Sequence, residues 1–171
     1  TADRLTWKGK NLLAMSNEQR RIIMRREIAV VFQDPTSSLD PSATLRAQLE
    51  ESIPEEFLDK GMFWQRNKQR KEIAIGLMHK VGIKNHEACL RRYPHEIATD
   101  IAQKFMIAMA LVSEPELLIA DDSTRSMEST TKNQILRLLS GLNETKNLSI
   151  LFVSHDLLAI SSMAHTMTVL Y

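Results

Sequence analysis

Leu117-Leu118-Ile119-Ala120-Asp121-Asp122 is a short apolar run that ends in two adjacent carboxylates. A run of this length, with Glu-Pro before it, fits a strand of a parallel sheet that is covered on both faces. A second apolar run, Leu148 to Val153, precedes Ser154-His155. We predict that the two runs are neighbouring buried strands, which would place the two carboxylates and the histidine at one edge of the sheet.

That edge is where open α/β sheets bind their ligands, outside the carboxyl ends of the strands. Asp121, Asp122 and His155 could hold a hard cation and a phosphate there. The ordinary alternative is that an aspartate after a buried strand forms a turn or caps a helix, and for the pair alone this alternative is the commoner one. Both interpretations stay open at this point.

The composition is that of a globular chain: 171 residues, 43% of them hydrophobic, suffice for one domain or for one domain with a subdomain. The formal net charge of +1 gives no argument for nucleic acid or for an acidic membrane surface. A single cysteine, Cys89, excludes an internal disulfide and a thiolate metal cluster, which fits a reducing compartment. No apolar stretch approaches the ~20 residues that span a bilayer, and the polar start has no secretory pattern, so we expect the cytoplasmic side.

Strands and helices are expected to alternate around a helical insertion. Residues 44–90 form that insertion, which Pro54 and Gly61 divide and Gly82 ends. The other expected elements are a helix capped by Ser16-Asn17-Glu18-Gln19, a strand Ile28 to Phe32, a loop Thr36 to Pro41, a buried helix Ile101 to Leu111 with Thr99-Asp100 as cap candidates, a helix through Ile135, Leu138, Leu139 and Leu142, a helix Asp156 to Met163 and a strand Thr166 to Tyr171. This order predicts an α/β fold with a parallel sheet.

One segment of the insertion is both aromatic and apolar. Met62-Phe63-Trp64 is expected in the core rather than on a docking surface, although both remain open. The basic residues after it, Arg66, Lys68, Arg70 and Lys71, are expected to form a solvated face rather than a nucleic-acid site.

Taken together, five segments resemble the nucleotide-binding subunit of ATP-binding cassette (ABC) transporters, and they follow one another in that family's order. They are Val31-Phe32-Gln33-Asp34-Pro35 for the Q-loop, Tyr93 to Leu111 for the signature region, Leu117 to Asp122 for Walker B, Arg125-Ser126-Met127-Glu128 for the D-loop and Val153-Ser154-His155-Asp156 for the switch histidine. Three segments have sequences similar to those of the dipeptide and oligopeptide importers, especially their Sap-type branch. They are Phe32 to Pro41, Tyr93-Pro94-His95-Glu96 and Met106 to Leu111.

This resemblance implies a partial P-loop NTPase core over residues 1–35 and 101–171, with a helical subdomain over 36–100. It implies an ATPase that drives peptide transport across the cytoplasmic membrane from its inner face. The implied partners are a second ATP-binding subunit, membrane permease subunits and, indirectly, a periplasmic peptide-binding protein, with no nucleic acid. A non-catalytic adaptor in a heterodimer and a DNA-repair type of ABC ATPase are the alternatives.

The resemblance also implies roles for residues, with ATP and Mg²⁺ as the cofactors. Asp121 would hold Mg²⁺, and Gln33 would touch the metal and the attacking water. Asp122 would orient that water and His155 would contact the γ-phosphate. Family members normally have glutamate at position 122, and aspartate reaches about 1.5 Å less. Because a misplacement of about 1 Å can cost on the order of 10²-fold in rate, we expect slow hydrolysis.

The signature region departs furthest from the family pattern. Ile97-Ala98-Thr99-Asp100-Ile101 stands where relatives have Leu-Ser-Gly-Gly-Gln, so Ala98, Thr99 and Asp100 would meet the phosphate held by the opposite subunit without a glycine. Glu128 replaces the D-loop aspartate and Ser123 the usual proline. No Gly-x-x-x-x-Gly-Lys-Ser/Thr occurs. We therefore expect a weak composite site, and a fragment of a longer subunit rather than a degenerate copy.

Overall fold

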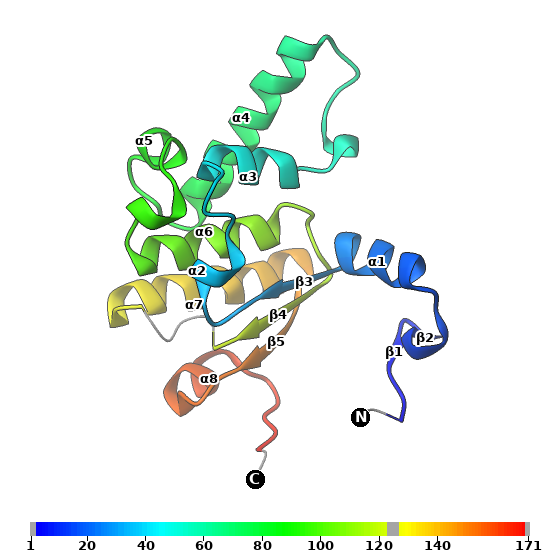
Figure 1. Ribbon diagram of the computed structural model, residues 1–171. Coiled ribbons are helices and arrows are strands. Elements are labelled where there is room, and N and C mark those ends of the chain that lie inside the picture. The colour runs from blue at the N-terminus through cyan, green and yellow to red at the C-terminus, as the bar shows by residue number, and fades with distance from the viewer. Residues whose placement is uncertain (1–2, 123–126, 170–171) are drawn as a thin grey trace.

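A computed structural model of the protein describes residues 3–122 and 127–169. Its centre is a parallel sheet with the strand order β3-β4-β5, in which β3 is Ile28–Val31, β4 is Leu117–Asp121 and β5 is Ser149–Val153 (Figure 1). Val31 lies opposite Ala120, which lies opposite Phe152. The predicted α/β class and the parallel pairing of β4 with β5 are confirmed.

Two long helices cover one face of this sheet, α6 (Thr99–Leu111) and α7 (Ser129–Lys146) (Figure 1). Leu118 and Ala120 of β4 are buried, and Leu118 packs in the same core as both helices. On β5, Leu151 and Val153 are half-exposed. The expectation of strands buried on both faces is therefore wrong for β5, because side chains alternate along a strand and only one set meets the two helices. On β4 the other set, Leu117 and Ile119, is partly buried against a second apolar cluster in the N-terminal part.

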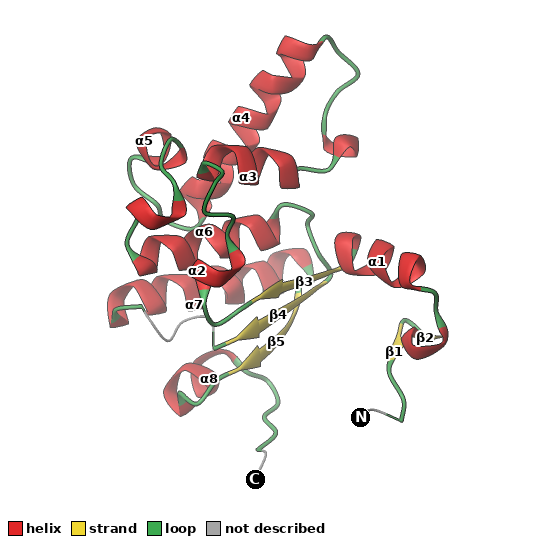
Figure 2. Ribbon diagram, in the orientation of Figure 1, coloured by secondary structure: helices red, strands yellow, loops and turns green. Residues whose placement is uncertain are grey.

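The helical insertion lies beyond α6, on the side away from the sheet (Figure 2). It consists of α3 (Leu45–Ser52), α4 (Phe63–Lys80) and α5 (His86–Leu90). Leu45, Leu49 and Met78 of these helices are buried in one cluster with Phe105 of α6. After α4, Gly82 takes a φ of +72°, a left-handed conformation that glycine adopts without a steric cost. One continuous core therefore joins the insertion to the sheet.

The N-terminal part forms a small unit beside β3. It contains a two-stranded hairpin of β1 (Thr6–Trp7) and β2 (Lys10–Asn11), the 3₁₀ helix η1 (Leu12–Ala14) and α1 (Asn17–Arg26). The predicted capping box is confirmed, since Ser16 and Gln19 each accept a hydrogen bond from the other's backbone. The remaining elements are α2 (Pro35–Ser38), η2 (Glu55–Phe57), η3 (Pro94–Glu96) and α8 (Leu157–Met163).

Three further expectations are wrong. The predicted loop Thr36 to Pro41 begins as the helical turn α2, because the Ser37 and Ser38 hydroxyls both donate to the Asp34 carbonyl. Of the predicted strand Thr166 to Tyr171, residues 166–169 form no strand, since apolar and β-branched composition does not suffice without a neighbouring strand to bond with, and residues 170–171 lie outside the described part of the chain. Met62-Phe63-Trp64 is exposed, because polar side chains rather than apolar packing join α4 to the loop that precedes it. None of the described helices is long and apolar enough to cross a membrane.

Candidate functional site

The carboxyl edge of the sheet brings together four of the residues predicted to form the site. Asp121 ends β4 opposite Val153, and the Asp122 amide donates to the Val153 carbonyl at 2.8 Å. Gln33 follows the end of β3 by two residues, and His155 follows the end of β5 by two. The strand ends therefore present two carboxylates, an amide and an imidazole along one edge, as the parallel topology requires.

Asp122 and His155 form a side-chain pair. The distance from Asp122 Oδ2 to His155 Nδ1 is 3.1 Å, with the aspartate side chain 13% exposed and the histidine side chain 66% exposed. The Ser154 hydroxyl lies 3.4 Å from Asp122 Oδ1 as a longer hydrogen-bond donor. Asp122 has a φ of +43°, in the left-handed region that aspartate enters more readily than most residues. This turn directs the carboxylate toward the loop after β5.

Such a pair has useful chemistry at a sheet edge. A carboxylate can accept a hydrogen bond from water and later a proton, and it fixes which nitrogen of the imidazole donates. With Nδ1 held by Asp122, the Nε2 atom of His155 is left to bond a ligand, as an acceptor when the ring is neutral and as a donor when it is charged. The exposed imidazole ring can contact a ligand while Asp122 holds its Nδ1 atom.

Asp121 and Gln33 are both exposed and both offer side-chain oxygens, the ligand type that Mg²⁺ prefers. No group of three or more His, Cys, Asp or Glu side chains converges on one point in the described ranges 3–122 and 127–169. The donor set therefore fits a magnesium ion that takes one or two ligands from the protein and the rest from water and phosphate, and it does not fit a closed protein cage.

The loop that carries His155 is held by the residue after it. Asp156 caps α8 by accepting the amides of Leu158 and Ala159, each at 3.1 Å, and its Oδ2 lies 2.7 Å from Nζ of Lys132 on α7. The hydrogen bond from Lys132, followed by the one from the Ala159 amide, lowers the pKa of Asp156. Lys132 thereby ties the first turns of α7 to the histidine loop.

The predicted signature residues lie at the start of α6. Ala98 is the N-cap and makes no side-chain capping bond, so the expectation that Thr99-Asp100 cap the helix is wrong. Thr99 and Asp100 are instead its first helical residues, because Ala98 is the last residue with an extended backbone. Their predicted contact with a phosphate on an opposite subunit stays a prediction.

The predicted D-loop precedes α7. Glu128 is exposed and is the N-cap of α7, where its carbonyl accepts the Lys132 amide at 2.8 Å while its side chain caps nothing. Met127 of the same segment is buried, whereas Ser123, Arg125 and Ser126 lie outside the described residues.

The sequence analysis missed two polar residues in the buried helix α6. Gln103 is fully buried, its Nε2 donates to the Phe32 carbonyl at 3.2 Å, and its Oε1 has no hydrogen-bond partner among the described residues. Lys104 is also buried and donates to the Gly82 carbonyl at 3.4 Å. The sequence could have indicated both, because they are the two polar residues inside the apolar run from Ile101 to Leu111. Gln103 joins α6 to the residue that immediately precedes Gln33.

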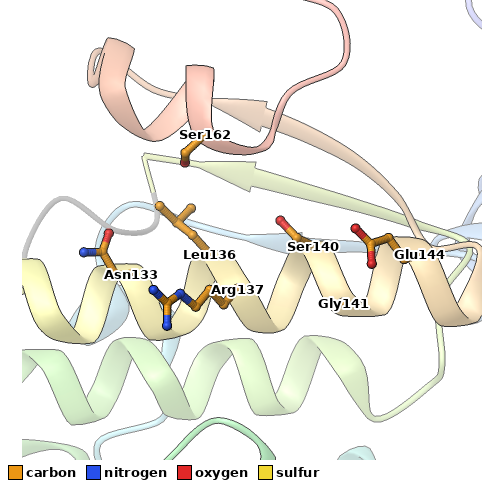
Figure 3. A pocket seen from close by; sticks show the side chains of 7 residues that line it. All are labelled: Asn133, Leu136, Arg137, Ser140, Gly141, Glu144 and Ser162. Carbon is orange, nitrogen blue, oxygen red and sulfur yellow. The ribbon is translucent and has the colours of Figure 1, made fainter.

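A separate open pocket of about 520 Å³ lies between α7 and α8 (Figure 3). It contains none of the predicted site residues, and Arg137 and Glu144 place opposite charges on its wall. Its lining residues are Asn133, Leu136, Arg137, Ser140, Gly141, Glu144 and Ser162. The sheet edge, where the Asp122–His155 pair lies, is the better candidate because it has the groups that could act on a ligand.

Comparison with known proteins agrees with this fold. The sequence pattern of the ABC transporter family matches residues 1–125. The chain is 46% identical over 171 residues to the peptide transport system ATP-binding protein SapD of Salmonella typhimurium. It is 35% identical over 171 residues to the dipeptide transport ATP-binding protein DppD of Escherichia coli K12. All or nearly all of the chain aligns, and it spans about half the length of these curated relatives, 52% and 50%.

Solved structures show the same fold at lower identity. The ATP-binding cassette MJ0796, solved as a dimer in a post-hydrolysis state bound to ADP and Pi, gives a TM-score of 0.78 at 23% identity over 90% of this chain and 62% of that one. The cbiO1 protein from Clostridium perfringens, part of the ABC transporter complex cbiONQ, gives a TM-score of 0.67 at 20% identity over 90% of this chain and 56% of that one.

Proposed function

Because the chain belongs to the ABC transporter family, we propose that the protein containing it is the ATP-binding subunit of a peptide transporter. The observation that carries the proposal is the Asp122–His155 pair beside Asp121, at the carboxyl edge of a parallel sheet. The relatives named as peptide and dipeptide transport ATP-binding proteins suggest the class of transported substrate.

In this proposal the sheet edge holds Mg²⁺ and the phosphates of ATP. Asp121 and Gln33 would supply oxygen ligands to Mg²⁺, which when bound would neutralise part of the phosphate charge. Asp122 would orient the attacking water through its carboxylate, and the hydroxyl of Ser154, 3.4 Å from Oδ1, lies at the same carboxylate. His155, held at Nδ1 by Asp122, would in its charged form donate from Nε2 to an oxygen of the γ-phosphate.

The proposal extends to the arrangement of the whole transporter. Residues 1–35 and 101–171 would be the ATPase core and 36–100 the helical subdomain. Two ATP-binding subunits would pair so that Ala98, Thr99, Asp100 and Glu128 face the nucleotide of the opposite subunit. The pair would work with membrane permease subunits, and indirectly with a periplasmic peptide-binding protein, at the inner face of the cytoplasmic membrane.

A second candidate is an adaptor that binds ATP while a different paired subunit hydrolyses it. The short side chain of Asp122 favours it, as does an α6 start that has no glycine and no side-chain cap. The two candidates differ in one outcome. If a heterodimer keeps its turnover after Asp122→Asn and loses it after the equivalent change in its partner subunit, the adaptor is correct.

The proposal is tested by ATP turnover of the full-length protein with its membrane subunits. The wild type is expected to hydrolyse ATP slowly, and Asp122→Glu to match or exceed it, since one methylene restores about 1.5 Å of reach. Asp122→Asn is expected to lower kcat by about 10²-fold or more, because a carboxylate that accepts the water's proton is lost. Absence of turnover in both the wild type and Asp122→Glu would contradict the ATPase assignment.

A further inference from the structure

A second open pocket, of about 600 Å³, lies where the end of α4, the loop that leads to α5 and the first half of α7 meet. We call it the α4–α5 cleft. Its volume is within the range of small-molecule sites, about 300–1,000 Å³. No aspartate or glutamate among the described residues lines it, whereas four of its lining residues are basic. These four are His79, Lys80, Lys84 and His86.

The cleft is built on the hydrophobic core. Val81, Ile83 and Ile135 belong to its lining and are only 2%, 3% and 1% exposed. Gly82, between the first two, has a positive φ, and its carbonyl accepts a hydrogen bond from Nζ of Lys104 at 3.4 Å. The basic residues are therefore carried by a loop whose backbone is fixed by core packing and by a bond to α6.

The lysines at this cleft have no acidic partner. Neither Lys80 nor Lys84 forms an ion pair within the described ranges 3–122 and 127–169. Lys104, which lies against the same loop, is 6% exposed, and its Nζ atom bonds a backbone carbonyl rather than a carboxylate. Burying a lysine charge without a carboxylate is costly. Three lysines thus gather at the cleft without a neutralising side chain among the described residues.

Two glutamates lie near this region, and each has a lysine of its own. Glu114 pairs with Lys146 at 2.7 Å, and Glu87 pairs with Lys71 at 2.9 Å. These hydrogen bonds are the main reason that the pKa of each glutamate is lowered, and Lys80 adds a smaller contribution at Glu114. The two glutamates are therefore already neutralised by lysines outside the cleft lining, which leaves the cleft with an excess of positive charge.

Helix stability explains only half of the basic residues in the lining. His79 and Lys80 lie in the last turn of α4, where positive charge complements the helix dipole. Lys84 lies beyond that helix, and His86 is the first residue of α5, where positive charge opposes the dipole. The lining thus presents one lysine and one histidine on each side of residues 81–83.

Two separated basic pairs complement a ligand that carries two anionic groups. Lysine binds phosphate as a point charge, and a histidine ring N–H can donate to a phosphate oxygen. A ligand with one anionic group would occupy one of the pairs and leave the other without a partner.

We propose that the α4–α5 cleft binds a small organic bisphosphate, with one phosphate group at His79 and Lys80 and the other at Lys84 and His86. The inference goes beyond the proposed ATPase, because none of the residues predicted to bind nucleotide or Mg²⁺ lines this cleft.

The test is calorimetric titration of the full-length protein, without nucleotide, with fructose 1,6-bisphosphate, fructose 6-phosphate and fructose. These probes share one carbon skeleton and differ in the number of phosphate groups. The bisphosphate is expected to bind at least tenfold more tightly than the monophosphate, with an affinity that falls as salt rises, and fructose is expected not to bind. Equal affinity for the two phosphates, or no binding of either, would overturn the proposal.

Lysine variants connect this binding to the cleft. Lys80→Gln and Lys84→Gln are each expected to lower the affinity for fructose 1,6-bisphosphate about tenfold, and the double variant about 10²-fold. Lys60→Gln is the matched control, since Lys60 is also exposed and without an ion pair within the described residues but does not line the cleft. It is expected to bind as the wild type does. An equal loss in Lys60→Gln, or wild-type affinity in the double variant, would contradict the proposal.

Labelling with an amine-reactive reagent locates the ligand. Saturating fructose 1,6-bisphosphate is expected to slow the labelling of Lys80 and Lys84 at least threefold and to leave Lys60 unchanged. Unchanged labelling of Lys80 and Lys84 would place the ligand elsewhere and overturn the proposal. Thermal unfolding and ATP turnover of Lys80→Gln/Lys84→Gln are expected to equal those of the wild type, so that failure of the cleft is distinguishable from misfolding and from failure of the ATPase.

Discussion

At the scale of single residues, the sheet edge is defined by how Asp122 and Gln103 are held. Asp122 turns into a left-handed conformation directly after β4 and meets His155, so its position depends on one backbone angle as well as on its side chain. Gln103 contacts the segment before Gln33, since its side-chain amide nitrogen donates to the Phe32 carbonyl. We infer that it positions Gln33 and touches no ligand itself.

Replacing Gln103 with leucine separates positioning from stability. The change removes the bond to Phe32 and also an unpartnered buried oxygen, so the free energy of unfolding is expected to stay within about 1 kcal/mol of the wild type. ATP turnover is expected to fall, because the segment before Gln33 loses its tie to α6. Thermal unfolding and kcat are measured together, with Gln134→Leu on the exposed face of α7 as control. A Gln103→Leu protein with unchanged kcat would remove the positioning role.

At the scale of elements, α7 and α8 meet through a charged contact. Lys132 in the first turns of α7 bonds the carboxylate that caps α8, and the capped loop carries His155. The start of α7 and the histidine loop are therefore joined through the Lys132–Asp156 pair. A change at the start of α7 is expected to reach the histidine by this route.

The pH dependence of Asp156 follows from this contact. Its pKa is lowered in the folded protein, so the contact stabilises the fold above the ordinary pKa of aspartate and the stabilisation is lost as pH falls through the lowered value. Lys132→Met is expected to raise the pKa of Asp156 and to reduce the loss of stability on acidification. A carboxyl titration by NMR measures the first effect, and thermal unfolding between pH 3 and pH 7 the second.

The control for this titration is Lys146→Met at the other end of α7. Lys146 pairs with Glu114 at 2.7 Å and lowers the pKa of that residue in the same way. It is expected to shift Glu114 and leave Asp156 unchanged. If Lys132→Met leaves the Asp156 titration where it is in the wild type, the contact does not exist in solution.

At the scale of the whole molecule, one core links the helical insertion to the sheet. Phe105 of α6 is fully buried in the cluster that contains both Leu49 of α3 and Leu118 of β4. The two layers are therefore expected to unfold together, and the insertion is expected to depend on α6 for its stability.

Phe105→Ala tests this linkage. Loss of a buried phenylalanine is expected to lower the free energy of unfolding by about 3–5 kcal/mol, in a single transition. Phe63→Ala, at the exposed start of α4, is the control. It is expected to change the free energy of unfolding by about 0.5 kcal/mol or less. Calorimetry that resolved two transitions, with only one of them shifted by Phe105→Ala, would contradict the single core.

The parallel strands and the carboxyl edge of the sheet were predictable from the sequence, because each strand is a short apolar run followed by polar residues. Asp121, Asp122 and His155 were placed at one edge from that pattern alone. The α2 turn was missed because it depends on hydroxyl contacts of Ser37 and Ser38 that no apolar period reveals. Phe63 and Trp64 were placed in the core because burial is usual for aromatic residues. In the structure they are exposed, and polar contacts made by Gln69 and Arg70 join α4 to the chain before it.

Single-turnover hydrolysis by a His155→Ala variant tests the central claim, that the sheet edge acts on ATP, most directly. The full-length protein with its membrane subunits is loaded with Mg·ATP, and bound nucleotide and released phosphate are both measured. His155→Ala is expected to retain ATP affinity within a few fold and to hydrolyse about 10²-fold more slowly than the wild type, since the imidazole that we propose contacts the γ-phosphate is gone. Hydrolysis at the wild-type rate would contradict the account.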